Sequence, residues 1–305
     1  MKKVYLYIIL TAILFSTLEP VGKLMAESVP PMVITAIRFL LGGIVLLLPA
    51  VYRIREEKVR ITSKILLKTA GLGILMVCGA MVLLQQAVHL SPSPAVVAIV
   101  FSVNSVFSIL LARPILKERI NRWHVIAFVL CMCGIFVSAD LAGGISAMPV
   151  FLAVLAAVVF SVYSVLGKKV MTDIPGTVVS CFSFLFGGGI LMLAQIVAGV
   201  EVGQFINTNT LPPLLYLGIA VTGIGFWGYF RVLSLSTAFN ASLVFFIKPI
   251  LTPFAVWIIN GLLPGVNIFV ALVLVLAGSL IAAKQSSGNR ISTKADISKE
   301  HEHAN

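Results

Sequence analysis

FSTLEPVGK, residues 15–23, and FSVYSVLGK, residues 160–168, are two copies of one pattern that lie 145 residues apart. When the chain is laid over itself at this offset, residues 15–48 align with residues 160–193 without a gap, and 12 of the 34 positions are identical. The identities include glycines, a proline and a lysine, which a shared apolar composition does not readily produce. The pattern therefore predicts two units of one fold.

The composition is that of a protein that crosses a membrane several times. Of the 305 residues, 59% are hydrophobic and only 11% are charged, and the mean hydropathy is +1.08. A soluble domain carries about 25% charged residues. One globular core cannot hide so much apolar surface, so we predict an all-α, polytopic membrane protein.

Apolar runs long enough to cross the bilayer occur ten times, because a membrane-spanning helix needs about 20 such residues. Turn residues such as Pro30-Pro31 and Pro175-Gly176 separate them. The first unit covers residues 4–140, the second covers residues 148–284, and the polar tail 285–305 is predicted to be disordered. The ten runs are residues 4–25, 32–51, 66–87, 94–112, 122–140, 148–167, 175–198, 212–232, 239–259 and 266–284.

The positions of the cations predict the orientation. If the N-terminus is cytoplasmic, 18 of the 22 Lys and Arg residues lie on the cytoplasmic side, and the outer loops contain none. We therefore expect a protein of the cell membrane with both termini in the cytoplasm. The net charge of +11 is then a topology signal rather than the footprint of a nucleic-acid-binding protein.

Each unit contains five predicted spans, so the second unit must have the opposite orientation to the first. Inverted repeats of this kind are typical of secondary transporters, whose binding sites lie near the middle of the bilayer. The sequence contains no nucleotide-binding loop and no hydrolase motif. We therefore expect that the protein is not an enzyme and that it binds no cofactor. Cys131 and Cys133 lack a second pair, so no metal site is expected.

Charged residues inside the spans are the candidates for a site, because a charge at the centre of the bilayer costs about 2.5–3.5 kcal/mol. Glu19 could bind a proton or cation, or it could pair with Lys23, four residues further along the same helix. The adjacent Pro20 loosens the helix and frees backbone groups. Only the first copy of the repeat has Glu19 and Pro20.

Two cations in other spans need anions. Lys248, followed by Pro249, lies near the middle of its span and requires a carboxylate, either from the protein or from a substrate. Arg38 could meet Glu19, Glu27 or a substrate carboxylate.

Polar and aromatic residues complete the candidate set. Tyr163 and Ser164 occupy the repeat positions of Leu18 and Glu19, and we expect them on the opposite side of the site. Gln85, Gln86 and Asn104 should face the interior, because lipid offers them no hydrogen bonds. Trp227 could contact a cationic substrate or lie at the lipid interface. The binding candidates are Glu19, Arg38, Lys248, Tyr163, Ser164, Asn104, Gln86 and Trp227, and the gating candidates are Pro20, Lys23 and Pro249.

Three groups of residues resemble a known family. They are the series Ser16, Lys23, Pro30 and Arg38, the turn Lys117-Glu118-Arg119-Ile120, and the small residues Ala238, Ala241 and Ser242 before Pro249. Over residues 5–284 the chain is similar to the EamA-type permeases of the drug/metabolite transporter superfamily. It departs from the family pattern where Asn104 replaces a proline, and where Leu263 and Ser183 stand opposite Glu118 and Arg38.

The resemblance implies a carrier of amino acids, amines, sugars or similar metabolites. With the inverted repeat, it favours a secondary transporter that moves a small polar metabolite by alternating access, coupled to protons or another ion. A flippase for lipids or lipid-linked sugars and a membrane sensor without transport activity are the alternatives.

Overall fold

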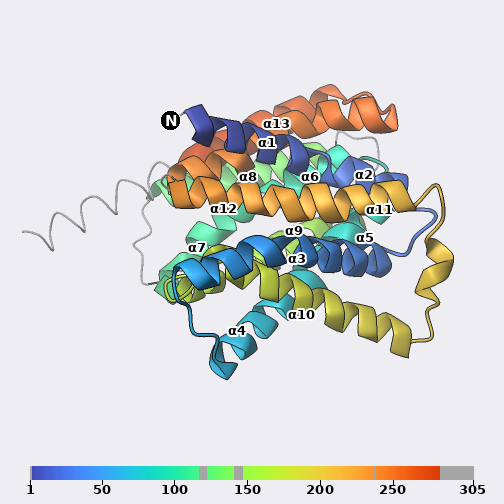
Figure 1. Ribbon diagram of the computed structural model, residues 1–305. Coiled ribbons are helices and arrows are strands. Elements are labelled where there is room, and N and C mark those ends of the chain that lie inside the picture. Colours follow the sequence, from blue (N-terminus) through green and yellow to red (C-terminus); the bar gives the residue numbers. More distant parts are fainter. Residues whose placement is uncertain (1, 117–121, 141–146, 236–237, 282–305) are drawn as a thin grey trace, which may run out of the picture.

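The computed structural model describes residues 2–116, 122–140, 147–235 and 238–281. Within these ranges every regular element is a helix (Figure 1). The turn at 117–120 and the tail 285–305 lie outside the described residues. The predicted all-α class is confirmed.

Within the described ranges, ten apolar helical stretches lie at the positions of the ten predicted spans. Seven are long and apolar enough to cross a membrane, namely Val4–Leu24, Pro31–Glu56, Ser63–Leu90, Ala147–Val170, Gly176–Val197, Leu211–Val232 and Leu243–Asn260. Three shorter apolar helices, Pro94–Ser108, Val125–Ser138 and Val266–Ile281, occupy the positions of the remaining three. These helices agree with the prediction of a polytopic membrane protein.

Several spans are built from more than one helical segment. The first unit consists of α1 (Lys2–Ser16), α2 (Leu18–Leu24), α3 (Pro31–Glu56), α4 (Ser63–Gly73), the π-helical η1 (Ile74–Met81), α5 (Val82–Leu90), α6 (Pro94–Ser102), α7 (Asn104–Leu116) and α8 (Arg122–Asp140). The second consists of α9 (Ala147–Val170), α10 (Gly176–Val197), the short 3₁₀ helix η2 (Val202–Phe205), α11 (Leu211–Leu215), the π-helical η3 (Tyr216–Ile224), α12 (Gly225–Leu235), α13 (Ala238–Asn260) and the helix Val266–Ile281.

The repeat is visible in the local backbone. Pro30 and Pro175 are N-cap residues of α3 and α10, with φ, ψ of −57°, 139° and −56°, 137°. Proline favours this extended conformation, so each helix begins directly after it. The two π-helical segments also match, because an offset of 145 residues carries η1 onto 219–226, which overlaps η3.

The two units pack together along α3 and α10 (Figure 1). Phe39 and Phe184 occupy equivalent positions in the repeat, and their rings meet edge to face at a centroid distance of 4.9 Å. A second close contact joins Gly187 of α10 to Gly73, where an added Cβ would collide with the facing backbone. Small residues allow the two helix backbones to approach closely. In lipid the hydrophobic effect does not drive helices together, so this close van der Waals packing holds them instead.

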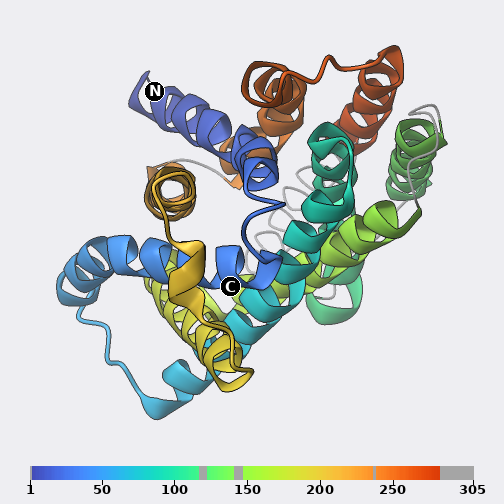
Figure 2. The ribbon, with the colours of Figure 1, turned by 90° about the vertical axis from the view of Figure 1, so that its right-hand side faces the viewer.

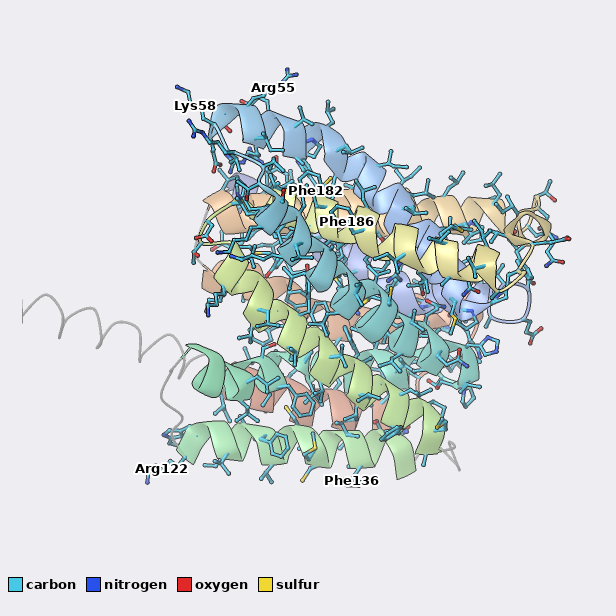
Figure 3. The ribbon with its side chains drawn as sticks, turned by 90° about the horizontal axis from the view of Figure 1, so that it is seen from below. Arg55, Lys58, Arg122, Phe136, Phe182 and Phe186 are labelled. Atoms are coloured by element: carbon cyan, nitrogen blue, oxygen red, sulfur yellow. The ribbon has the colours of Figure 1, made fainter. Side chains whose placement is uncertain are left out.

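Cations gather at one end of the helix bundle. Arg55, Lys58 and Arg122 all lie at the end where α1 begins (Figures 1 and 3). The opposite end, which faces the viewer in Figure 2, contains α2 and the segment 199–210. The charge asymmetry of the sequence is therefore also an asymmetry between the two ends of the bundle.

Candidate functional site

A buried ion pair joins the two repeats. The Nζ atom of Lys248 on α13 donates a hydrogen bond of 2.6 Å to Oε1 of Glu19 on α2. The side chains are 6% and 0% exposed, respectively. Sequence reasoning selected both residues but proposed Lys23 as a partner of Glu19. The structure instead pairs Glu19 with a residue 229 positions away.

The local sequence explains why Glu19 can reach α13. The first span breaks at Thr17, so Glu19 and Pro20 belong to the first turn of a new helix, α2. Backbone N–H groups in a first turn have no partner within the helix, so a proline there removes no helical hydrogen bond. A carboxylate in the first turn also faces the positive end of the helix dipole.

Lys248 has an aromatic neighbour that the sequence did not reveal. Its Nζ lies 5.4 Å from the centroid of the Phe101 ring, at the end of α6. An ammonium near the face of a buried ring is attracted by the quadrupole of the ring. The Nδ2 atom of Asn104 donates 2.7 Å to the carbonyl of Phe101, and Ser161 of α9 donates 2.8 Å to the carbonyl of Asn104. Asn104 thus supports the α6–α7 break beside the ion pair.

Arg38 on α3 adds a second cation. Arg38 is 3% exposed, and its Cζ lies 4.7 Å from the centroid of the Phe39 ring. Its charge is within electrostatic range of the Glu19 carboxylate. Within the described residues, Oε2 of Glu19 and Nε of Arg38 are buried and have no hydrogen-bond partner. The site therefore combines one carboxylate with two cations and leaves an acceptor and a donor unused.

The segment that carries Glu19 makes further contacts through its backbone. Asn260 Nδ2 at the end of α13 donates 3.1 Å to the carbonyl of Pro20. Gln85 Nε2 on α5 donates 3.4 Å to the carbonyl of Gly22. Lys23 donates 3.0 Å to the carbonyl of His89. Sequence reasoning expected both Gln85 and Gln86 to face the interior and chose Gln86 as the binding candidate, but the residue that contacts α2 is the buried Gln85. Asn260 lies just after the predicted span 239–259 and was not among the candidates.

The remaining candidates lie on other partners. Tyr163 is buried and is linked to the site by a chain of ring contacts. The ring centroid of Phe160 lies 5.8 Å from that of Tyr163 and 5.4 Å from that of Phe101. Ser164 donates to the carbonyl of Phe160 in its own helix.

Trp227 and Pro249 also have defined surroundings. Trp227 is half-buried and packs edge to face on Tyr7 at 5.6 Å. Pro249 lies inside α13, next to Lys248, and α13 continues through it as a helix. Pro249 is therefore adjacent to the ion pair in sequence, whereas the Trp227 ring contacts α1.

Comparison with known proteins places this geometry in a family. Residues 2–139 and 147–283 each match the model of the EamA-like transporter family. An uncharacterized transporter from Clostridium kluyveri is 34% identical over 290 residues, which cover 92% of this chain and 93% of that protein. A probable terminal-alkyne amino-acid exporter from Streptantibioticus cattleyicolor is 27% identical over 198 residues, or 63% of this chain and 65% of that protein.

A solved structure has the same fold. It superposes with a TM-score of 0.65, covers 94% of this chain and 98% of its own, and is 21% identical in sequence. The two family matches lie on the two sequence repeats, and the names of both relatives indicate transport rather than catalysis. The chain belongs to the EamA-like transporter family.

Proposed function

We propose that this protein is a secondary transporter that carries a small zwitterionic metabolite of the amino-acid class across the cell membrane, with both termini in the cytoplasm. The observation that carries the proposal is the buried pair of Glu19 and Lys248, with the charge of Arg38 within electrostatic range of Glu19. The pair joins one helix from each repeat. In an inverted-repeat transporter, the interface between repeats is where substrate binds and where the two conformations exchange.

The charges of the site favour a zwitterion. Separating a buried ion pair leaves two uncompensated charges, which is costly unless another ion replaces each partner. An ammonium group can take the place of Lys248 at Glu19, while a carboxylate takes the place of Glu19 at Lys248 and Arg38. An amine alone would leave both cations without an anion, and a neutral sugar would compensate none of the charges.

The same pair offers a route for coupling to an ion gradient. A proton on the unused Oε2 of Glu19 would neutralise the carboxylate that holds the substrate ammonium group. Proton and substrate would then occupy the site alternately, so a proton gradient could drive transport by exchange. Carboxylates in membrane spans commonly serve as such relays.

A relative supports the substrate class. The Streptantibioticus protein that is 27% identical to this chain is named as a probable amino-acid exporter. Its similarity covers 63% of this chain. The relative and the charges of the site therefore indicate the same chemical class by independent arguments.

Counterflow in proteoliposomes tests the proposal. Purified protein is reconstituted and loaded in turn with L-amino acids, primary amines and neutral sugars, and uptake of the labelled compound is measured. We expect counterflow with amino acids only, and its loss in Glu19→Gln and Lys248→Ala. Selective transport of amines or sugars, or amino-acid transport that both substitutions leave intact, would contradict the proposal.

A further inference from the structure

The helical segment α2 has few hydrogen bonds of its own. It contains seven residues, of which one is proline, and it is separated from α1 at Thr17. A helix of this length is not stable by itself, because the cost of nucleation is not recovered in one or two turns. The position of α2, and with it that of Glu19, must therefore be fixed by contacts with other helices.

Two amide side chains supply these contacts to the backbone of α2. Asn260 donates to the carbonyl of Pro20, directly after Glu19. Gln85 donates to the carbonyl of Gly22, three residues after Glu19. One amide comes from the second repeat and the other from the first, so α2 is held between the two units. We call Gln85 and Asn260 the amide clamp.

The fit of the clamp depends on a glycine. A Cβ atom on Gly22 would lie 2.9 Å from Nε2 and 3.1 Å from Oε1 of Gln85. Its equivalent in the second repeat, Gly167, would place a Cβ 3.9 Å from the methyl group of Met171, which is an ordinary contact. The repeat thus contains the same glycine twice, but only the copy in α2 accommodates an amide.

We propose that Gln85 and Asn260 are positioning residues that hold Glu19 against Lys248 and set how readily this ion pair opens to substrate. The effect of this positioning role on transport rests on the proposed function, whereas its effect on the local stability of α2 does not. A merely structural role would lower the stability of the whole protein. A positioning role would loosen α2 while the remaining helices stay folded.

The first experiment measures the opening of α2 without any substrate. The four native cysteines are replaced by alanine, and Val21, which is 7% exposed, is changed to cysteine as a probe. The rate of reaction with a hydrophilic maleimide is then measured in detergent for Gln85→Met, Asn260→Leu and Gly22→Ala. Circular dichroism and size-exclusion chromatography confirm that each variant is folded.

Two matched controls accompany these variants. Gly167→Ala places the same methyl group at the equivalent repeat position. Gln195→Met removes a buried amide whose Nε2 donates 3.4 Å to Sδ of Met32, away from α2. We expect labelling to accelerate about tenfold in the clamp variants, as the loss of one buried hydrogen bond allows, and to stay within about twofold in the controls. Equal labelling of Gly22→Ala and Gly167→Ala, with unchanged rates in Gln85→Met and Asn260→Leu, would overturn the proposal.

The second experiment measures transport of an L-amino acid by the same variants. The clamp variants should raise KM by about tenfold, because a poorly placed Glu19 binds the ammonium group weakly, and should change the maximal rate less. A fall of about tenfold in the maximal rate, with KM unchanged, would contradict the positioning role. If wild-type protein transports no amino acid, the proposed function fails, and the labelling rates still decide whether the clamp holds α2.

Discussion

At the scale of single residues, the ion pair of Glu19 and Lys248 places two opposite charges inside the protein. Both side chains are almost completely buried and they approach to 2.6 Å. A buried pair adds little net stability because both charges lose their hydration. Its members nevertheless depend on each other, since removal of either one leaves a buried charge without compensation.

This dependence gives the first prediction. Lys248→Met should lower the free energy of unfolding by about 3–5 kcal/mol, because Glu19 is left without its partner. The double variant Glu19→Gln, Lys248→Met should recover most of that loss, since the carboxylate that Lys248→Met leaves unpaired is removed as well. Thermal unfolding in a mild detergent measures both effects. Strictly additive losses in the double variant would show that the two residues do not form a pair in the folded protein.

The sequence predicted the members of this site better than their partners. Glu19 stood out because its repeat equivalent is Ser164, and Lys248 because a cation lay inside a span. Their pairing requires two helices 229 residues apart to be neighbours, which helical periodicity cannot show. Gln85 and Gln86 could not be separated either, because both are polar and adjacent and only the packing determines which one faces α2.

At the scale of helices, close approach between α10 and its neighbours determines which glycines matter. A Cβ on Gly187 would collide with the carbonyl oxygen of Gly73 and lie 2.7 Å from Cγ2 of Val77. Gly189, two residues later on the same helix, has open space where its Cβ would be. The two glycines have the same intrinsic cost in a helix but different surroundings.

A pair of substitutions tests this packing. Gly187→Ala should lower the free energy of unfolding by about 1–3 kcal/mol, because helix backbones must move apart. Gly189→Ala should raise it by about 0.5–1 kcal/mol, because alanine loses less backbone entropy in a helix. The melting temperatures of the two variants, compared under identical detergent conditions, provide the measurement. A shift of the same sign in both would argue against the close contact at Gly187.

Helix boundaries were predicted where the sequence contains strong breakers and not elsewhere. Pro30 and Pro175 mark the starts of α3 and α10 as expected. The π-helical segments η1 and η3 were not predicted, because the change from four-residue to five-residue hydrogen bonding leaves no signature in an apolar run. The break at Thr17 was foreseen only as a loosening beside Pro20.

At the scale of the whole molecule, the two ends of the helix bundle differ in charge. Arg55, Lys58 and Arg122 lie at one end, and α2 lies toward the other (Figures 1 and 3). The sequence predicted this arrangement from the number of spans and the positions of the cations. It could do so because the apolar length of a span and the charge of a loop are local properties.

Cysteine labelling in intact cells tests the orientation. In a chain without native cysteines, Glu201→Cys should react with a membrane-impermeant maleimide added outside, because Glu201 is exposed in the segment 199–210. Lys58→Cys should react only after the membrane is permeabilised, since the basic end is expected in the cytoplasm. The reversed pattern would place the termini outside the cell.

The central claim is that the ion pair of Glu19 and Lys248 is the substrate site. The most direct measurement compares amino-acid counterflow in proteoliposomes for wild-type protein and the double variant Glu19→Gln, Lys248→Met, in which both members of the pair are neutral. We predict that the variant melts within a few degrees of the wild type, as expected for removal of a whole pair, but shows no saturable counterflow. A folded double variant that exchanges amino acids at the wild-type rate would contradict the claim.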